Sequence, residues 1–217
     1  MIAPPRRPRV LLADDHLLAA EALRSLLTPE FDLVGVVEDG RALLEAAGRM
    51  RPDVIVADIT MPHLNGIDAL VRLRQSGDRV PVVFLTMHRD VTFARRALEA
   101  GASGFVLKHS ASIELIAALH AALEGKTYLT PQLAGEVLEA MQQGPERAAD
   151  PIDSLTPRQR EVLQLLAEGR SAKQIASSLS ISTRTVEFHK YQMMETLGLH
   201  TNAELIHFAI KNGLVEF

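Results

Sequence analysis

The chain has 217 residues, of which 47% are hydrophobic and 23% charged, the balance of a globular protein with one or two domains. No apolar run approaches the roughly 18 residues that span a bilayer, and the first one stops at Asp14 and Asp15, so we expect neither a membrane protein nor a signal peptide. The lack of cysteine excludes disulfides, thiolate metal sites and cysteine nucleophiles, and we expect a cytoplasmic protein.

The net charge of −4 is unevenly distributed along the chain. Residues 151–217 contain equal numbers of acidic and basic residues, so the whole excess of acid lies in the first 150 residues. An acidic first part suits a cation site. A neutral second part is, by charge alone, only a weak sign of nucleic-acid binding.

Short apolar runs alternate with amphipathic stretches up to residue 126. The runs cover residues 9–15, 32–37, 53–58, 80–87 and 104–108. Apolar residues at consecutive positions are typical of strands buried on both faces, and the stretches between them are long enough for crossover helices. The pattern predicts an α/β fold with a five-stranded, doubly wound parallel sheet.

The second part of the chain shows helical patterns only. A helix is predicted over residues 131–141, with Thr130 and Pro131 at its start, and the polar segment QQGPERAADP follows it. We therefore predict three parts: a first domain over residues 1–127, a linker over 128–152 that includes helix 131–141, and an all-α domain over residues 153–217.

Charged and hydroxyl side chains stand at the ends of the predicted strands: Asp14 and Asp15, Asp58, Thr86 and Lys108. The carboxyl ends of parallel strands meet at one edge of the sheet, where functional groups gather. Three carboxylates repel one another unless a multivalent cation joins them, and hard oxygen ligands favour Mg²⁺. A hydroxyl and an ammonium opposite them would hold a phosphoryl group in transfer to one carboxylate, for which the central Asp58 is best placed. The alternative is that the aspartates cap helices and Lys108 is a solvated surface charge.

The segments LLADDH, VIVADITMPHLNG, VFLTMHRD and GASGFVLKH carry a specific resemblance. Residues 8–125 resemble a response-regulator receiver domain of the NarL/FixJ type, which has a flavodoxin-like fold. The resemblance implies that a sensor histidine kinase donates a phosphoryl group to Asp58. It further implies that Asp15, Asp58 and the Thr60 carbonyl bind Mg²⁺, with help from Asp14.

The same resemblance implies that Thr86 and Lys108 sense the phosphoryl group and that an aromatic side chain, here Phe105, turns inward. Phe105 replaces a frequent Tyr, so it offers no hydroxyl for a switched hydrogen bond. His109 follows Lys108 where many receivers have Pro, and we expect no cis peptide there, because a non-proline cis bond costs about 2.5–4 kcal/mol.

Two residues flank the expected path of attacking water, and one of them departs from the family. Thr60 stands where many relatives have Asn, and metal binding should survive because the metal takes the backbone carbonyl. Thr60 and His88 lie two residues after Asp58 and Thr86, so we predict that they tune the lifetime of the phosphoryl group. His16 is expected at the surface and not as a metal ligand.

The region after residue 153 predicts a helix-turn-helix. Thr156 with Gln159, and Ser171 with Gln174, fit capping boxes at the starts of two short helices, and a third helix begins after Ser182. On this third helix Val186, Met193 and Leu197 fall on one face, and the opposite face carries Arg184, Phe188, Tyr191 and Glu195. Exposed aromatic residues are unusual unless something covers them, and the DNA major groove accepts such a helix. Alternatively, the aromatics pack on the first domain or a neighbouring helix.

Residues 153–215 resemble the LuxR-type DNA-binding domain in their apolar positions, in the run from Arg160 to Leu163, and in Thr185-Val186 with His189. The resemblance implies base contacts by Glu187, Phe188 and Tyr191. The side chains suited to phosphate contacts are Lys173, Arg184 and Lys190, with Thr183 and Thr185 as helpers. Glu187 stands where relatives often have Lys, so it should trade affinity for selectivity, since a carboxylate accepts from cytosine but repels phosphate.

The last predicted helix is apolar on more than one stripe, through Leu205, Ile206 and Ala209 among others. In relatives this helix pairs two DNA-binding domains, and core packing is the alternative.

We predict a transcription regulator, not an enzyme, that is phosphorylated on Asp58 and dimerises to bind double-stranded promoter DNA. A phosphorylation-independent scaffold or constitutive regulator is the second hypothesis. A phosphatase or flavin protein is the third, and the lack of a Gly-rich phosphate loop argues against it.

Overall fold

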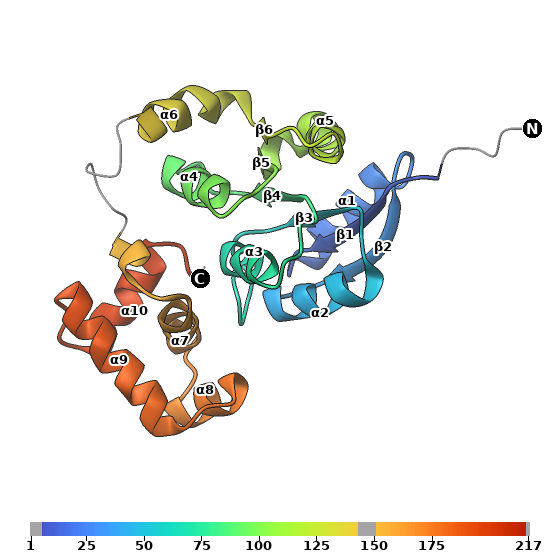
Figure 1. Ribbon diagram of the computed structural model, residues 1–217. Coiled ribbons are helices and arrows are strands. Elements are labelled where there is room, and N and C mark those ends of the chain that lie inside the picture. The colour runs from blue at the N-terminus through green and yellow to red at the C-terminus, as the bar shows by residue number, and fades with distance from the viewer. Residues whose placement is uncertain (1–5, 143–150, 216–217) are drawn as a thin grey trace, which may run out of the picture. The chain divides into compact units, whose positions relative to one another are not determined.

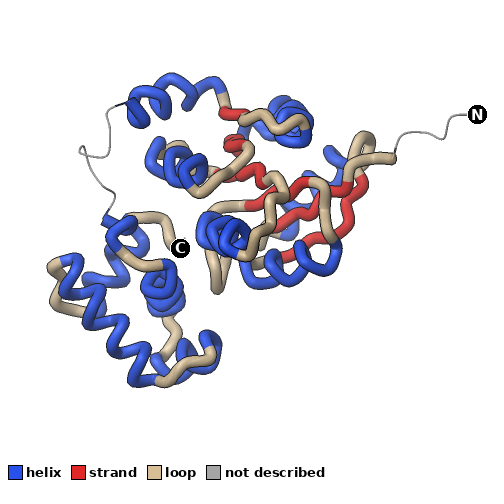
Figure 2. Tube along the Cα trace, in the orientation of Figure 1, coloured by secondary structure: helices blue, strands red, loops and turns tan. Residues whose placement is uncertain are grey.

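The structure, a computed structural model, describes residues 6–142 and 151–215. These residues form two compact units (Figure 1). The first is built from residues 6–61 and 65–142 and contains a sheet, and the second consists chiefly of residues 151–215 and is helical (Figure 2). Within the described part of the chain, no helix has the length and apolarity to cross a membrane.

The described residues of the first unit form a six-stranded parallel sheet in the order β2-β1-β3-β4-β5-β6. The strands are β1 (Arg9–Ala13), β2 (Asp32–Val37), β3 (Val54–Ala57), β4 (Val82–Thr86), β5 (Gly104–Leu107) and β6 (Tyr128–Leu129). The predicted doubly wound α/β fold is confirmed, with one strand more than the five predicted. A strand of only two half-buried residues, such as β6, has no periodic pattern that a sequence could reveal.

Helices cover both faces of this sheet (Figure 1). Helices α1 (Leu17–Leu27) and α5 (Ala111–Leu123) share one apolar cluster with β1, β3, β4 and β5. The remaining crossover helices are α2 (Gly40–Met50), α3 (Gly66–Gln75) and α4 (Val91–Glu99). Strands β3, β4 and β5 are buried throughout, but β2 is only partly buried. The prediction of burial on both faces was wrong for β2, because β2 is an edge strand.

The helix predicted over residues 131–141 is present as α6 (Pro131–Gln142). Leu133 and Val137 are buried, and α6 packs against α4, so the helix is part of the first unit. The rest of the predicted linker up to residue 150 lies outside the described residues. A short 3₁₀ helix, η1 (Lys108–Ser110), follows β5, and the described peptide bonds are all trans, including the one before His109, as expected.

The second unit contains the predicted helix-turn-helix. Its elements are η2 (Pro151–Ser154), α7 (Pro157–Ala167), α8 (Ala172–Leu179), α9 (Thr183–Leu197) and α10 (Asn202–Lys211). Both predicted capping boxes are present, and a further one joins Thr201 to Glu204 at the start of α10. The Arg158 guanidinium pairs with the buried Glu161 at 3.0 Å and donates to the Leu179 carbonyl at 2.9 Å, which ties α7 to the end of α8.

Candidate functional site

A pocket of buried charge lies at the carboxyl edge of the sheet. Asp14 follows β1 and Asp58 follows β3, and these strands pair with each other up to Ala13 and Ala57. Both aspartates are buried, with exposed fractions of 2% and 6%. The Lys108 Nζ lies 2.8 Å from Asp14 Oδ2 and 2.6 Å from Asp58 Oδ2. Three of the residues predicted for this edge are thus in direct contact.

The charges in this pocket do not balance. Burial raises the pKa of Asp58, the ammonium of Lys108 lowers it in part, and the nearby Asp14 raises it further. Burial alone would lower the pKa of Lys108, but the charge of Asp58 and hydrogen bonds to Asp14 and Asp58 outweigh it and raise that pKa. Lys108 is therefore a cation at neutral pH, shared between two carboxylates.

The donor atoms of the pocket fit a hard divalent cation. One carboxylate oxygen from each of Asp14, Asp15 and Asp58, and one ring nitrogen of His16, lie within 4.8 Å of one another. Oxygen donors of this kind favour Mg²⁺, whose charge would offset the excess that Lys108 leaves uncompensated. The residues present therefore fit the predicted metal.

His16 was expected at the surface and not as a metal ligand; it is at the surface, and its ring lies beside the aspartates of the pocket. Its side chain is 60% exposed, but Nδ1 lies 3.0 Å from Asp15 Oδ1 and 3.3 Å from Asp14 Oδ1. The backbone N–H of His16 also donates to Asp14 Oδ1 at 2.9 Å. The signal in the sequence was its place directly after the two aspartates.

The residues predicted to sense the phosphoryl group and to tune its lifetime lie on neighbouring strand ends. Thr86 is fully buried, and its hydroxyl oxygen accepts a hydrogen bond from the His88 backbone N–H at 3.2 Å. The His88 Nε2 lies 2.8 Å from the Thr60 hydroxyl oxygen, and the His88 ring stacks on Phe93 with centroids 4.5 Å apart. Thr60 and His88, predicted together to tune the lifetime of the phosphoryl group, are thus hydrogen-bonded to each other. Phe105 is fully buried, so its ring is already turned inward.

Sequence reasoning missed the residues that fix the loop after Asp58. A Cβ on Gly66 would lie 2.1 Å from the Asp58 carbonyl oxygen, and the Gly66 N–H donates to the Ile59 carbonyl at 2.8 Å. The Asn65 side chain accepts from the Asp68 N–H at 2.9 Å and donates to the Asp68 carboxylate at 2.8 Å. The Asn65-Gly66 pair in the quoted segment was the available signal, because such pairs mark tight turns.

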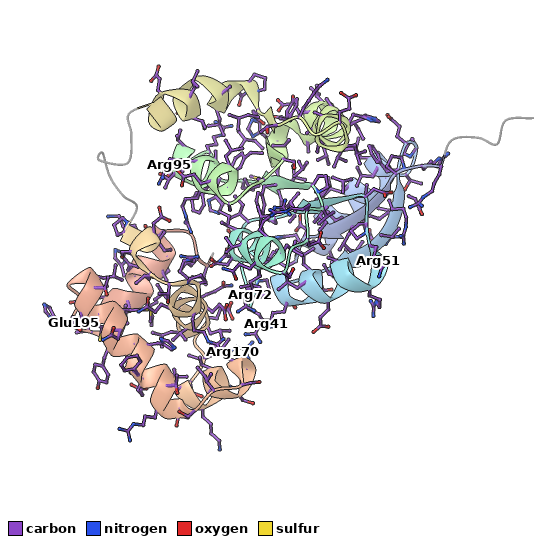
Figure 3. All side chains as sticks on the ribbon, viewed as in Figure 1. Arg41, Arg51, Arg72, Arg95, Arg170 and Glu195 are labelled. Atoms are coloured by element: carbon purple, nitrogen blue, oxygen red, sulfur yellow. The ribbon has the colours of Figure 1, made fainter. Side chains whose placement is uncertain are left out.

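The outer face of α9 is exposed as predicted. Phe188 and Tyr191 are 59% and 66% exposed, whereas Val186 and Met193 lie in the core of the second unit. Packing of the two aromatics on a neighbouring helix is therefore wrong. Glu195 belongs to the same exposed face, and its side chain projects from the helix (Figure 3). The hydroxyl of Ser182 caps the start of α9 by accepting from the Thr185 N–H at 3.0 Å.

Glu187 and Lys190 of α9 form an ion pair with each other, although Glu187 was predicted to contact bases and Lys190 to contact phosphates. The Lys190 Nζ lies 2.5 Å from Glu187 Oε2 and 5.8 Å from the centre of the Tyr191 ring. The other predicted cations, Lys173 and Arg184, are exposed, as is Thr183, while Thr185 is half-buried. Contact with DNA would require Lys190 to exchange Glu187 for a phosphate.

The residues predicted for pairing on α10 need a correction. Leu205 and Ala209 are fully buried in the core of the second unit, so a partner cannot contact them, and core packing explains both. Ile206 is half-buried. Ile210, one turn further along, is 39% exposed; it was counted among the apolar residues of this helix but not among those predicted for pairing.

Known proteins resemble this chain over both units. Residues 10–120 match the response regulator receiver domain, and residues 153–209 match the luxR family of bacterial regulatory proteins. The chain is 34% identical to transcriptional regulatory protein MctR of Rhizobium johnstonii, covering 95% of each chain. It is 32% identical to oxygen regulatory protein NreC of Staphylococcus aureus, over 96% of this chain and all of that one.

Solved structures of two similar proteins also cover nearly the whole chain. RcsB from Salmonella enterica serovar Typhimurium, bound to a promoter in the presence of the phosphomimetic BeF₃⁻, is 27% identical with a TM-score of 0.61, over 93% of this chain and 98% of that one. The response regulator ChrA of a heme-sensing two-component system is 33% identical with a TM-score of 0.51, over 96% and 99% of the two chains.

Gly66→Ala should displace the backbone that carries Asp58. The new methyl group would overlap the Asp58 carbonyl, so we expect a loss of roughly 1–3 kcal/mol in the free energy of unfolding, measured by urea titration and circular dichroism. Gly48→Ala is the matched control, because its Cβ meets nothing within 4 Å and a helix gains from alanine. Equal effects of the two changes would contradict the steric explanation.

Asp58→Asn should stabilise the metal-free protein at neutral pH. The pKa of Asp58 is raised on folding, so its ionised form opposes folding above that pKa, and the opposition disappears as the pH falls through it. Thermal unfolding in EDTA should therefore give a higher Tm for the variant at pH 7 and no difference in acid. Added Mg²⁺ should raise the Tm of the unmodified protein more than that of the variant. A lower Tm for Asp58→Asn in EDTA at pH 7 would rule this out.

Proposed function

Because this chain belongs to the response regulators that join a receiver domain to a LuxR-type DNA-binding domain, we propose that phosphorylation of Asp58 by a histidine kinase controls its binding to DNA. Proteins of this family are transcriptional regulators and not enzymes. The single observation that carries the proposal is the contact of Lys108 with both Asp14 and Asp58, because it puts the expected acceptor and the expected sensor together.

The receiver residues would act on the phosphoryl group in a defined order. A carboxylate oxygen of Asp58 attacks the phosphorus of a phosphohistidine, and the bond from phosphorus to the imidazole nitrogen breaks. Asp15, Asp58 and the Thr60 carbonyl, assisted by Asp14, would hold Mg²⁺, which neutralises charge on the phosphoryl oxygens. Lys108 then moves from Asp58 Oδ2 to a phosphoryl oxygen and keeps Asp14 as its second partner. The Thr86 hydroxyl, which accepts from His88, still has its own proton to donate to another phosphoryl oxygen.

The second unit supports contact with the major groove of double-stranded DNA. The exposed aromatics Phe188 and Tyr191 offer apolar contacts to base edges, and Arg184 and Lys173 are exposed for phosphates. Glu187 would accept from a cytosine amino group, and its pairing with Lys190 lowers the positive charge offered to the backbone. A neutral domain binds weakly as a single copy, so two copies are needed for useful affinity.

Dimerisation on phosphorylation is the remaining part of the proposal. RcsB, a relative of known structure, binds DNA as dimers. Since Leu205 and Ala209 are buried, the pairing surface on α10 would use Ile206 and Ile210, which lie one turn apart. The division into a receiver over residues 1–127, a linker over 128–152 and a DNA-binding domain over 153–217, and the cytoplasmic location, remain predictions.

The proposal is tested with the full-length protein and a small phosphodonor in the presence of Mg²⁺. We expect label on the unmodified protein and on Asp32→Asn, an exposed carboxylate outside the pocket, but none on Asp58→Asn. Labelling should double the solution mass measured by light scattering and should enrich specific duplexes from a random DNA library. Label on Asp58→Asn would exclude Asp58 as the acceptor. DNA selection that is independent of the label would favour the constitutive regulator.

Thr60→Val and His88→Ala should each shorten the lifetime of the phosphoryl group. Either change removes the hydrogen bond that holds the His88 ring near the expected path of water. Because the two residues share one interaction, the double variant should be only slightly faster than either single one. The measurement is the loss of label after the donor is removed, with Met87→Ala, an exposed side chain in the same loop, as control. Unchanged rates in both single variants would refute the tuning role.

A further inference from the structure

Thr130, the residue before α6, is hydrogen-bonded to Leu107, the last residue of β5 and the one directly before Lys108. Thr130 is fully buried, and its hydroxyl makes two hydrogen bonds. It accepts from the Leu107 N–H at 3.3 Å and donates to Glu114 Oε2 on α5 at 2.7 Å. The Thr130 backbone N–H donates to the Phe105 carbonyl at 3.0 Å. Thr130 was predicted only to begin a helix, and its hydroxyl also joins three elements.

These bonds extend the sheet beyond its last paired residues. The ladder between β5 and β6 ends at Phe105 and Leu129, so the Leu107 N–H lies past the last pair. The Thr130 hydroxyl gives this buried N–H its partner, because an unpaired one would be costly. Leu107 is the residue directly before Lys108, so a displacement of Lys108 acts on this bond first.

A second link lies on the other side of Lys108. The His109 Nε2 is 3.2 Å from the Gln132 Oε1, which belongs to the first turn of α6. The two chain neighbours of Lys108 are thus both hydrogen-bonded to residues at the start of α6, one through a buried hydroxyl and one at the surface.

Helix α6 also packs against α4, which is linked to the other residue expected to sense the phosphoryl group. Leu133 and Val137 are buried, and α6 packs against α4. Phe93 of α4 stacks on His88, whose backbone N–H is bonded to the Thr86 hydroxyl. Helix α6 is therefore connected to both residues expected to sense the phosphoryl group, Thr86 through α4 and Lys108 through β5.

We propose that Thr130 and Glu114 form a latch that makes α6 follow the position of Lys108. When Lys108 leaves Asp58 for a phosphoryl oxygen, the backbone at Leu107 and His109 moves, and the Thr130 hydroxyl, held by Glu114, passes that movement to the start of α6. The chain continues from α6 to residues 151–215, so α6 is the first element of the path toward the DNA-binding domain. Thr130 is a positioning residue in this device, and the inference rests on the proposed phosphorylation of Asp58.

The test uses hydrogen exchange of the full-length protein with and without Mg²⁺ and BeF₃⁻ as the phosphoryl mimic. In the unmodified protein, peptides over residues 104–110 and over α6 should both change their exchange. In Thr130→Val, which keeps the shape and removes the hydroxyl, residues 104–110 should still respond in full, and the response of α6 should be much smaller because only its packing on α4 remains. Exchange of α6 without the mimic should rise roughly fivefold, as expected for the loss of one hydrogen bond. Thr130→Ser keeps the hydroxyl and should respond like the unmodified protein.

Glu114→Ala is a second variant in case Thr130→Val fails to fold, because Glu114 is only partly buried. It removes the acceptor of the Thr130 proton and should also uncouple α6 from residues 104–110. An α6 response that is undiminished in Thr130→Val or in Glu114→Ala overturns the latch. A responsive 104–110 segment with a silent α6 in the unmodified protein overturns it as well, while leaving the proposed function intact. No response at residues 104–110, with no label on Asp58, overturns the proposed function and the latch together.

Discussion

The sharing of one ammonium between two buried carboxylates is the interaction on which the receiver half depends. Lys108 satisfies Asp14 and Asp58 at once, but one positive charge does not balance two negative ones in a place that water hardly reaches. The remaining negative charge makes the pocket receptive to a divalent cation. It also leaves Lys108 free to change partner without becoming unpaired, which is what a sensor of a new charge requires.

Most of this pocket could be predicted from the sequence, because two strong rules act together. Consecutive apolar residues mark the buried strands, and parallel strands bring their carboxyl ends to one edge. Asp14, Asp58 and Lys108 were therefore expected at the same edge of the sheet, where the structure brings them into contact. The Gly66 contact with the Asp58 carbonyl and the bond between Thr60 and His88 could not be predicted, since they depend on how loops fold back over that edge.

Where one residue pattern fits two kinds of packing, the sequence could not decide between them. Helix α10 is apolar on more than one stripe, and both a core and a pairing surface have that composition, so only the burial of Leu205 and Ala209 separates them. On α9 the polar and apolar faces differ clearly, and its exposed aromatics could be identified. The role of the Thr130 hydroxyl was hidden because a threonine before a proline already has a simple explanation as a helix start.

The ion pair between Glu187 and Lys190 affects how this protein would search a genome. A lysine that already has an internal counterion displaces fewer salt ions when it meets the duplex, because one ion pair is exchanged for another. The contribution of Lys190 to binding arbitrary sequence would then be smaller than that of an unpaired lysine. Occupancy of a specific site would then depend more on how well the exposed side chains of α9 fit the base edges.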